Sequence, residues 1–181
     1  MIYIALLRGI NVGGNNIIKM ADLRQCLESA DYENVSTYIQ SGNVLFSHKK
    51  VANHKLEEKL EKLLKKKFSY DGKVVVVSAS ELAKVVKEAP KGFGNKPDKY
   101  RYDVIFLKEP LTPTETVKEI PVNEEVDEIS KGKQAVYFSR LIAKATKSKL
   151  AKIVSLPVYK QVTIRNWNTT TKLLEMSQDL K

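Results

Sequence analysis

The amino-acid sequence predicts an α+β fold built from two ferredoxin-like βαββαβ halves, with an extra helix at the C-terminus. Three observations support this fold class. Short apolar runs with the two-residue period of strands alternate with amphipathic stretches of helical period. The order strand, helix, strand, strand, helix, strand occurs twice within 181 residues, a length that suits one large or two small domains. A loop rich in Gly, Pro and Lys at residues 90–99 separates the two occurrences.

The first half is expected to occupy residues 1–78. It opens with a strand at residues 2–8, which is apolar on both faces and is therefore expected at the centre of a sheet. Apolar residues at helical spacing from Met20 to Ala30 predict the first helix. The remaining elements are two strands joined by a tight turn, a long amphipathic helix and an apolar strand, at residues 35–40, 44–47, 56–68 and 74–77.

The second half is expected at residues 100–181, after a connecting helix and loop at residues 79–99. The connecting helix begins with the spacing of a capping box, Ser78-Ala79-Ser80-Glu81. The first helix of the second half has the same signal in Thr112-Pro113-Thr114-Glu115, with proline at the first helical position. The other elements are a strand, two strands joined by a turn, a helix, a short strand and a last helix, at residues 102–107, 125–129, 135–139, 150–154, 162–164 and 173–176.

The charge of the chain is unevenly distributed. The net charge is +10, and the stretch from Ile129 to Leu174 contains ten basic residues and no acidic one. Such a field favours an anionic partner, a nucleotide or a nucleic acid, near the C-terminal third. The alternative is a lysine-rich surface that serves only solubility.

The cysteine and histidine content argues against disulfide and metal sites. One cysteine, Cys26, allows no internal disulfide, and His48 and His54 with one cysteine make no recognisable metal-ligand set. No apolar run approaches the roughly 20 residues needed to cross a bilayer. The N-terminus lacks the basic region of a signal peptide. We therefore expect a cytoplasmic protein with no membrane contact, no metal and no cofactor, and the sequence leaves its oligomeric state open.

Three stretches resemble a known family. They are Leu6–Gly14, with the sequence LLRGINVGG; Thr37–Val44, with TYIQSGNV; and Thr163–Thr169, with TIRNWNT, the last preceded by Ser148-Lys149-Leu150. Together they resemble a widespread bacterial family that is known only as a domain of unknown function. Family members often carry a second threonine where this chain has Ile164. The resemblance implies paired ferredoxin-like subdomains and brings no activity with it.

The loop after the first strand is one candidate ligand site. Glycines permit positive φ and close backbone approach, amides at a helix N-terminus attract anions, and an arginine adds a bidentate contact. The candidate residues of this loop and of the tight turn are Arg8, Gly9, Asn11, Gly13, Gly14, Asn15, Ser41 and Asn43. The glycine spacing matches neither a Walker A loop nor the Rossmann fingerprint, so a purely structural loop is the alternative. No catalytic residue is predicted, because no base lies near Ser41 in the sequence.

The segment around the only tryptophan is the second candidate site. Its candidate residues are Lys149, Arg165, Asn166, Trp167 and Asn168. Arg165 would contact an anion, and Trp167 would stack on a base. The side-chain amides of the asparagines would form hydrogen bonds with the edges of that base. The structural alternative makes Asn166 or Asn168 the N-cap of the last helix and buries the ring of Trp167 at the junction.

The leading functional hypothesis is a binding module for an anionic ligand, a nucleotide or nucleic acid. One alternative is an enzyme acting on a small phosphorylated or carboxylated metabolite in a cleft between the halves, for which no general base can be assigned. Another is a self-associating protein. The aromatic signature of an RRM domain is absent, and the neighbours Tyr137 and Phe138 point to opposite faces of their strand, so at most one lies on an open sheet surface.

Overall fold

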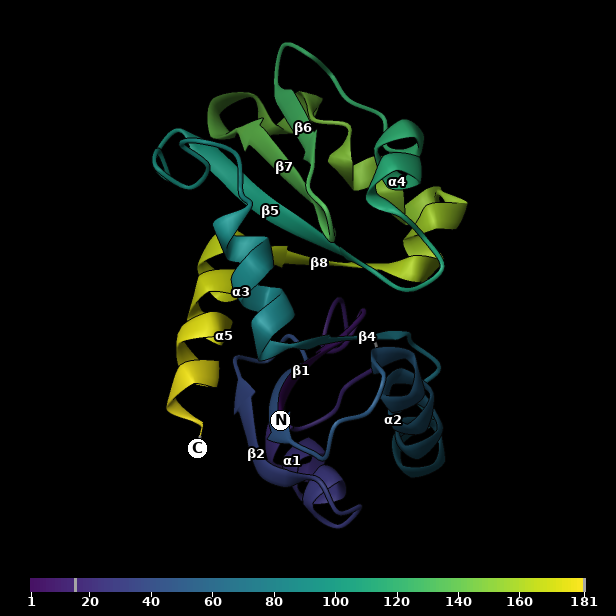
Figure 1. The fold of residues 1–181 in the computed structure, drawn as a ribbon. Coiled ribbons are helices and arrows are strands. Elements are labelled where there is room, and N and C mark those ends of the chain that lie inside the picture. Colours follow the sequence, from purple (N-terminus) through teal and green to yellow (C-terminus); the bar gives the residue numbers. More distant parts are fainter. Residues whose placement is uncertain (15, 181) are drawn as a thin grey trace. The chain divides into compact units, whose positions relative to one another are not determined.

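Two four-stranded antiparallel sheets with helices form the computed structural model, which describes residues 1–14 and 16–180 (Figure 1). The strand orders are β2-β3-β1-β4 and β6-β7-β5-β8, so the two βαββαβ halves repeat one topology and the predicted duplication is confirmed. The elements in chain order are β1 (Ile2–Leu7), α1 (Met20–Glu28), β2 (Glu33–Tyr38), β3 (Asn43–Ser47), α2 (Asn53–Phe68), β4 (Val74–Ser78), α3 (Ala79–Lys87), β5 (Tyr100–Leu107), α4 (Pro113–Glu119), β6 (Asp127–Lys131), β7 (Ala135–Leu141), the 3₁₀ helices η1 (Ile142–Lys147), η2 (Leu150–Ser155) and η3 (Pro157–Gln161), β8 (Val162–Asn166) and α5 (Trp167–Asp179).

The chain divides into two compact units, each of which contains one complete sheet. The first unit comprises Met1–Leu82 and the residues from Lys172 onward, and the second comprises Ala83–Thr171. The divisions fall inside α3 and inside α5. Most of the segment 79–99 therefore belongs to the second unit, and the C-terminal helix is shared between the units.

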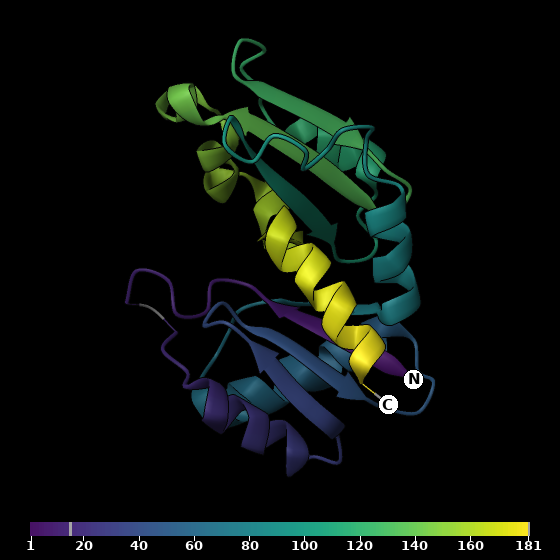
Figure 2. The ribbon, with the colours of Figure 1, turned by 90° about the vertical axis from the view of Figure 1, so that its left-hand side faces the viewer.

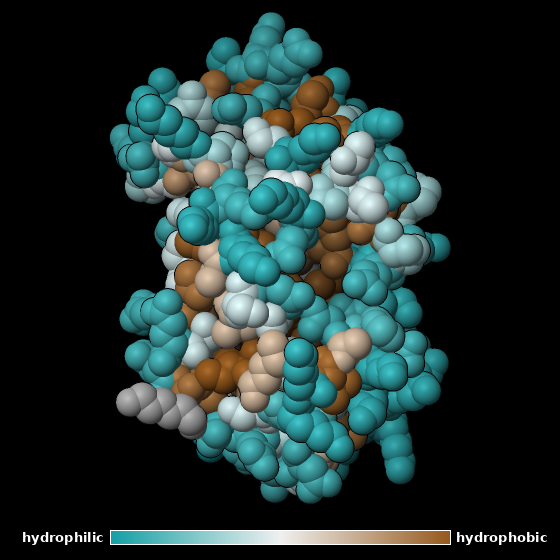
Figure 3. Space-filling model, in the orientation of Figure 1, coloured by the Kyte–Doolittle hydropathy of each residue, from teal (hydrophilic) through white to brown (hydrophobic). Residues whose placement is uncertain are grey.

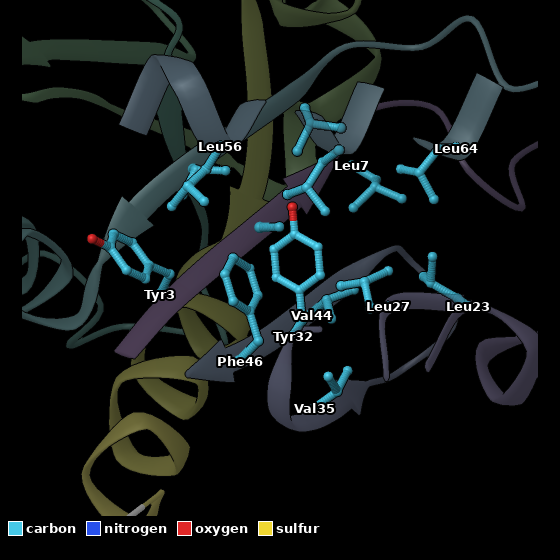
Figure 4. Close-up of a cluster of buried hydrophobic side chains, with 14 of the residues drawn as sticks. Tyr3, Leu7, Leu23, Leu27, Tyr32, Val35, Val44, Phe46, Leu56 and Leu64 are labelled. Atoms are coloured by element: carbon cyan, nitrogen blue, oxygen red, sulfur yellow. The ribbon is translucent and has the colours of Figure 1, made fainter. Parts of the chain in front are cut away.

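The core of the first unit lies between its sheet and the helices α1 and α2. β1 pairs with β3 on one side and β4 on the other, which confirms its predicted central position. Phe46 lies between Tyr3 and Tyr32 (Figure 4), with ring centroids 5.8 Å from the first and 4.9 Å from the second. Fully burying one such side chain stabilises the fold by about 1.5–3 kcal/mol.

The core of the second unit covers one face of its sheet. Ile105, Val136 and Phe138 pack there against α4 and the 3₁₀ helices. Because side chains alternate along a strand, the neighbours Tyr102, Val104 and Tyr137 lie on the other face. The second face is buried as well, since all three of these side chains are less than 9% exposed.

The helix predicted at residues 150–154 is present as the 3₁₀ helix η2, which lies between two further 3₁₀ helices, η1 and η3 (Figure 2). The apolar residues Leu150, Ile153 and Leu156 recur every three residues, which is the period of a 3₁₀ helix. Val154, which an α-helical face would bury, is 62% exposed. Pro157 then opens η3, where it needs no backbone N–H.

Several local signals in the sequence match the structure. Thr112 and Glu115 form the predicted capping box of α4, and Ser78 and Glu81 exchange the corresponding hydrogen bonds at α3. The strand predicted at residues 125–129 lies two residues later, because the N–H groups of Val126 and Asp127 both donate to the Asn123 carbonyl in a turn.

The surface seen in Figure 3 is largely hydrophilic, with apolar residues in separate patches. Among residues 1–14 and 16–180, each helix is too short or too polar to span a bilayer.

Candidate functional site

A cavity of about 510 Å³ lies in the second unit beside the first residues of β5. β8 ends at Asn166, which pairs with Asp103, so residues 100–102 of β5 extend beyond the end of β8. This free stretch of β5 lines one part of the cavity, and the β8–α5 junction, with Asn166, Trp167 and Asn168, lines another. Three residues of the second predicted site are thus brought together at one cavity.

Two arginines that the sequence reasoning missed line this cavity. Arg101 and Arg140 lie directly opposite each other across the β5–β7 pair. The Arg140 Nη2 atom is 3.4 Å from Asp103 Oδ2, whereas Arg101 forms no ion pair within 4 Å among the described residues. No carboxylate belongs to the described lining of the cavity. The arrangement leaves a net positive charge facing the cavity.

Two buried carboxylates, those of Asp103 and Asp127, lie near Arg140 in the sheet. Asp103 is 6% exposed, and burial raises the pKa of its carboxyl, against the lowering effect of Arg140 and Arg101. Asp127 lies opposite Arg140 on β6, and its Oδ2 accepts hydrogen bonds from the backbone N–H groups of Asn123 and Lys149, at 3.0 and 2.9 Å. Among the described residues, Arg140 therefore has one protein carboxylate, that of Asp103, within ion-pair distance, and Arg101 is available to an anion.

Aromatic rings form the apolar part of the cavity. Tyr100, Tyr102 and Trp167 line it, and Phe93 makes edge-to-face contacts with Tyr102 at 4.8 Å and with Trp167 at 5.1 Å. A Cβ atom added to Gly94 would lie 2.3 Å from Trp167 Nε1, and Gly94 has φ +86°. The indole therefore packs directly on the backbone of the loop that carries Phe93, which fixes its orientation.

The two asparagines of the junction have different roles. Asn166 donates from Nδ2 to the Tyr102 carbonyl at 3.1 Å, and its Oδ1 accepts from the Asn168 N–H at 3.0 Å. Asn166 is therefore the N-cap of α5, as one of the two sequence interpretations had it. Asn168 is exposed, and its side-chain amide makes no hydrogen bond within the described part of the chain. It is the amide of this pair that a ligand can reach.

Arg165 and Lys149, the other members of the second predicted group, do not line the cavity. Arg165 is 7% exposed, and its Nη1 donates to Thr163 Oγ1 at 2.8 Å and to the Ile164 carbonyl at 2.9 Å. The backbone N–H of Lys149 donates a hydrogen bond to Asp127 Oδ2, so the backbone of Lys149, not its side chain, has a described role.

The first predicted group lies in the first unit, where Asn11 joins the loop to the tight turn. Its Nδ2 donates to the carbonyls of Ile18 and Gln40, each at 2.9 Å, and its Oδ1 accepts from the Ile18 N–H at 2.8 Å. Gly9, Gly13 and Gly14 all have positive φ, as predicted for this loop. Asn15 lies outside the described residues.

The other residues of the first group are held by backbone groups of the same unit. Arg8 donates its N–H to the Lys73 carbonyl at 3.0 Å, and its own carbonyl accepts from the Tyr70 hydroxyl at 2.7 Å. Asn43 is fully buried and donates from Nδ2 to the Tyr38 carbonyl and to Ser41 Oγ. The side-chain amides of Asn11 and Asn43 are thus used in bracing the backbone of this loop and turn.

Neither aromatic residue of β7 offers an open sheet surface. Tyr137 is 2% exposed and donates to the Val85 carbonyl at 2.6 Å, while Phe138 is fully buried on the opposite face. Burial, with the negative charge of Glu88, raises the pKa of Tyr137 to about 12. Base stacking on this strand, as in an RRM domain, is therefore blocked in this structure.

A weak signal for the missed residues was present in the sequence. Aromatic and charged residues alternate in Tyr100-Arg101-Tyr102-Asp103, at the start of a predicted strand. Their meeting with Arg140 depends on cross-strand register, which local patterns do not specify. Within residues 1–14 and 16–180, no three His, Cys, Asp or Glu side chains are grouped to hold a metal ion.

Comparisons with known proteins identify the family. The family described as "Protein of unknown function (DUF1697)" matches residues 1–137. The chain is also similar to the solved structure of conserved bacterial protein SP0830 from Streptococcus pneumoniae, with a TM-score of 0.82 and 28% identity over 97% of this chain and 98% of that one. Among curated proteins, none shows significant similarity to this chain. The chain belongs to the DUF1697 family of proteins of unknown function.

Proposed function

We propose that this protein is a binding module for an anionic ligand that carries an aromatic ring, a nucleotide or nucleic acid, and that the cavity beside β5 holds it. One observation carries the proposal: Arg101 and Arg140 share a cavity with Tyr100, Tyr102 and Trp167, and no carboxylate belongs to its described lining.

The chemistry of these side chains suits the two parts of a nucleotide. Guanidinium groups bind phosphate through paired, charge-assisted hydrogen bonds. Aromatic rings stack on any base, with a contribution of about 1–3 kcal/mol per base. The volume of about 510 Å³ falls within the range of small-molecule sites, roughly 300–1,000 Å³. The amide of Asn168 adds a donor and an acceptor for the edge of the base.

The same proposal places the protein in the cytoplasm, where nucleotides and nucleic acids are abundant. Cys26 is a buried free thiol, and burial raises its pKa, which suits a cysteine with a packing role in a reducing compartment.

The fluorescence of Trp167 tests the proposal directly, because this is the only tryptophan in the sequence and it lines the cavity. Purified protein is titrated with nucleoside monophosphates, with a short single-stranded oligonucleotide and with inorganic phosphate. We expect a saturable change with the nucleotides and the oligonucleotide. Inorganic phosphate lacks the ring and should give no comparable change at the same concentration.

Two charge variants separate site binding from general electrostatics. Arg101→Gln should weaken nucleotide binding about tenfold or more, which corresponds to the loss of one charge-assisted contact of about 1.4 kcal/mol. Arg24→Gln removes the same charge from an exposed position on α1 and should leave binding unchanged. Equal affinity of Arg101→Gln and the unmodified protein, or no response to any nucleotide or oligonucleotide, would contradict the proposal.

A further inference from the structure

A second cavity in the same unit shares two side chains with the first. It has a volume of about 310 Å³ and, like the first cavity, is lined by Tyr100 and Tyr102. The two tyrosine rings have centroids 6.1 Å apart and are inclined by 40°. The pair of rings is therefore common to two adjoining spaces, each of which has its own polar lining.

The chemistry of the second cavity suits another heterocyclic base rather than a second phosphate. Its cations are Lys91 and Lys96, and its neutral polar side chains are Asn95, Ser130 and Ser139. Glu128 also lines it, and a carboxylate repels phosphate but accepts hydrogen bonds from the exocyclic amino group of a base.

From this arrangement we infer that the ligand is a single-stranded nucleic acid of at least two nucleotides, with successive bases in the two cavities on either side of the Tyr100–Tyr102 pair. This inference rests on the proposed function and specifies its ligand. A mononucleotide has one base and can fill only one of the two spaces.

The charge around the first cavity fits a longer polyanion. Ile142 and Ala145 of η1 line the cavity, and the neighbouring Lys144 and Lys147 on the same short helix are exposed. Lys99 lies over the ring of Tyr100, with Nζ 5.6 Å from the centroid. Each phosphate neutralised by such lysines releases counterions, so a chain of nucleotides gains affinity that a single nucleotide cannot.

The cavities also favour a single strand over a duplex. Stacking on Tyr100 or Trp167 requires a base whose face is free. In a duplex the faces of the bases are covered by their neighbours, and the groove edges alone are accessible. A duplex can contact the surrounding lysines but cannot place bases in either cavity.

The test compares ligands of increasing length by titration of Trp167 fluorescence. Each titration is repeated at about 50, 100 and 200 mM KCl, so that the dependence of affinity on salt concentration is measured. The ligands are a mononucleotide, the corresponding dinucleotide, a single-stranded octanucleotide and the same octanucleotide as a duplex. We expect the dinucleotide to bind at least about tenfold more tightly than the mononucleotide. The octanucleotide should bind more tightly still, with the steepest loss of affinity on adding salt, and the duplex should bind weakly.

Variants locate the second base. Lys96→Gln changes only the second cavity and should lower dinucleotide affinity several-fold while leaving mononucleotide affinity unchanged. Lys118→Gln is the matched control, because Lys118 is exposed on α4, which packs on the other face of the sheet. Tyr100→Leu should weaken every ligand, and Tyr100→Phe, which keeps the ring, should not.

The outcomes separate this inference from the proposed function. Equal affinity for mononucleotide and dinucleotide, together with no effect of Lys96→Gln, would overturn the two-base inference and leave nucleotide binding intact. Duplex binding as tight as single-strand binding would also overturn it. If no ligand binds, the proposed function fails and the inference fails with it.

Discussion

Arg101 and Arg140 face each other across β5 and β7, and only Arg140 has a carboxylate, Asp103, within ion-pair distance among the described residues. Like charges directly opposite in a sheet destabilise the pair by about 0.2–1 kcal/mol. A protein that keeps such a pair beside a cavity gives up stability at that position. In the function we propose, the anionic ligand supplies the missing negative charge.

The first prediction follows from this pairing. Arg101→Gln should leave the free energy of unfolding unchanged or raise it by up to about 1 kcal/mol, because the repulsion is removed. The same variant should bind nucleotides about tenfold more weakly. Urea denaturation measures the first effect and Trp167 fluorescence the second. A clear drop in stability would instead assign Arg101 a structural role.

Asp103 should make the stability of the protein depend on pH. Burial raises the pKa of this carboxyl in the folded state, so between its unfolded and folded values the folded state binds more protons. The contribution of Asp103 is then fully present below the unfolded pKa and is lost as pH rises through the folded pKa. The difference in free energy of unfolding between the unmodified protein and Asp103→Asn should therefore decrease as pH rises over this window. Denaturant titrations at a series of pH values measure this difference, and a difference that grows with pH would contradict the assignment.

Tyr137 gives a prediction at alkaline pH. Its hydroxyl is buried and donates to the Val85 carbonyl, so Tyr137→Phe leaves a buried acceptor without that donor and should cost about 1–3 kcal/mol. The pKa of Tyr137 is raised from 10.0 to about 12, so this contribution is complete below pH 10 and lost as pH rises through about 12. The stability gap between the two proteins should narrow over that range. A difference in free energy of unfolding that stays constant with pH would show that the Tyr137 hydroxyl has the same pKa in the folded and unfolded states.

Two glycines of one loop provide a matched pair of variants. Gly92 and Gly94 have φ of +82° and +86°, and an alanine at either position carries the strain of a left-handed backbone, about 1–2 kcal/mol. Only at Gly94 would the added Cβ also collide with the Trp167 indole. Gly94→Ala should therefore lose more stability than Gly92→Ala, and it alone should shift the Trp167 emission spectrum. Identical spectra for the two variants would show that the indole does not pack on Gly94 in solution.

Local patterns were sufficient for most elements of the fold. β1 is apolar on both faces because it lies between β3 and β4, and this was visible in the sequence. The burial of β8 on both faces was not visible in the sequence. Thr163 and Arg165 alternate with apolar residues, as polar residues do on a strand with one face in solvent, yet both are buried. The second face of that sheet is itself covered, in part by Phe93, which contacts Tyr102 and Tyr137. A single sequence does not reveal which loop will cover which face.

The candidate site was predictable only in its contiguous part. Asn166, Trp167 and Asn168 adjoin in the chain, so their unusual composition drew attention to them. Arg101 and Arg140 are 39 positions apart and meet only through the pairing of β5 with β7. Long-range register of this kind is set by the whole sheet, so no local signal could have linked the two arginines.

The 3₁₀ helices that stand between β7 and β8 have a consequence for how relatives of this protein diverge. The short helices η2 and η3 dock through one or two buried side chains each, namely Leu150, Ile153 and Val158, whereas η1 buries none. Residues inserted or lost between them would leave the pairing of β5 with β8 in place, whereas a change within a long α-helix would rotate its whole apolar face. Changes in the length of this segment can therefore accumulate while the sheet stays the same.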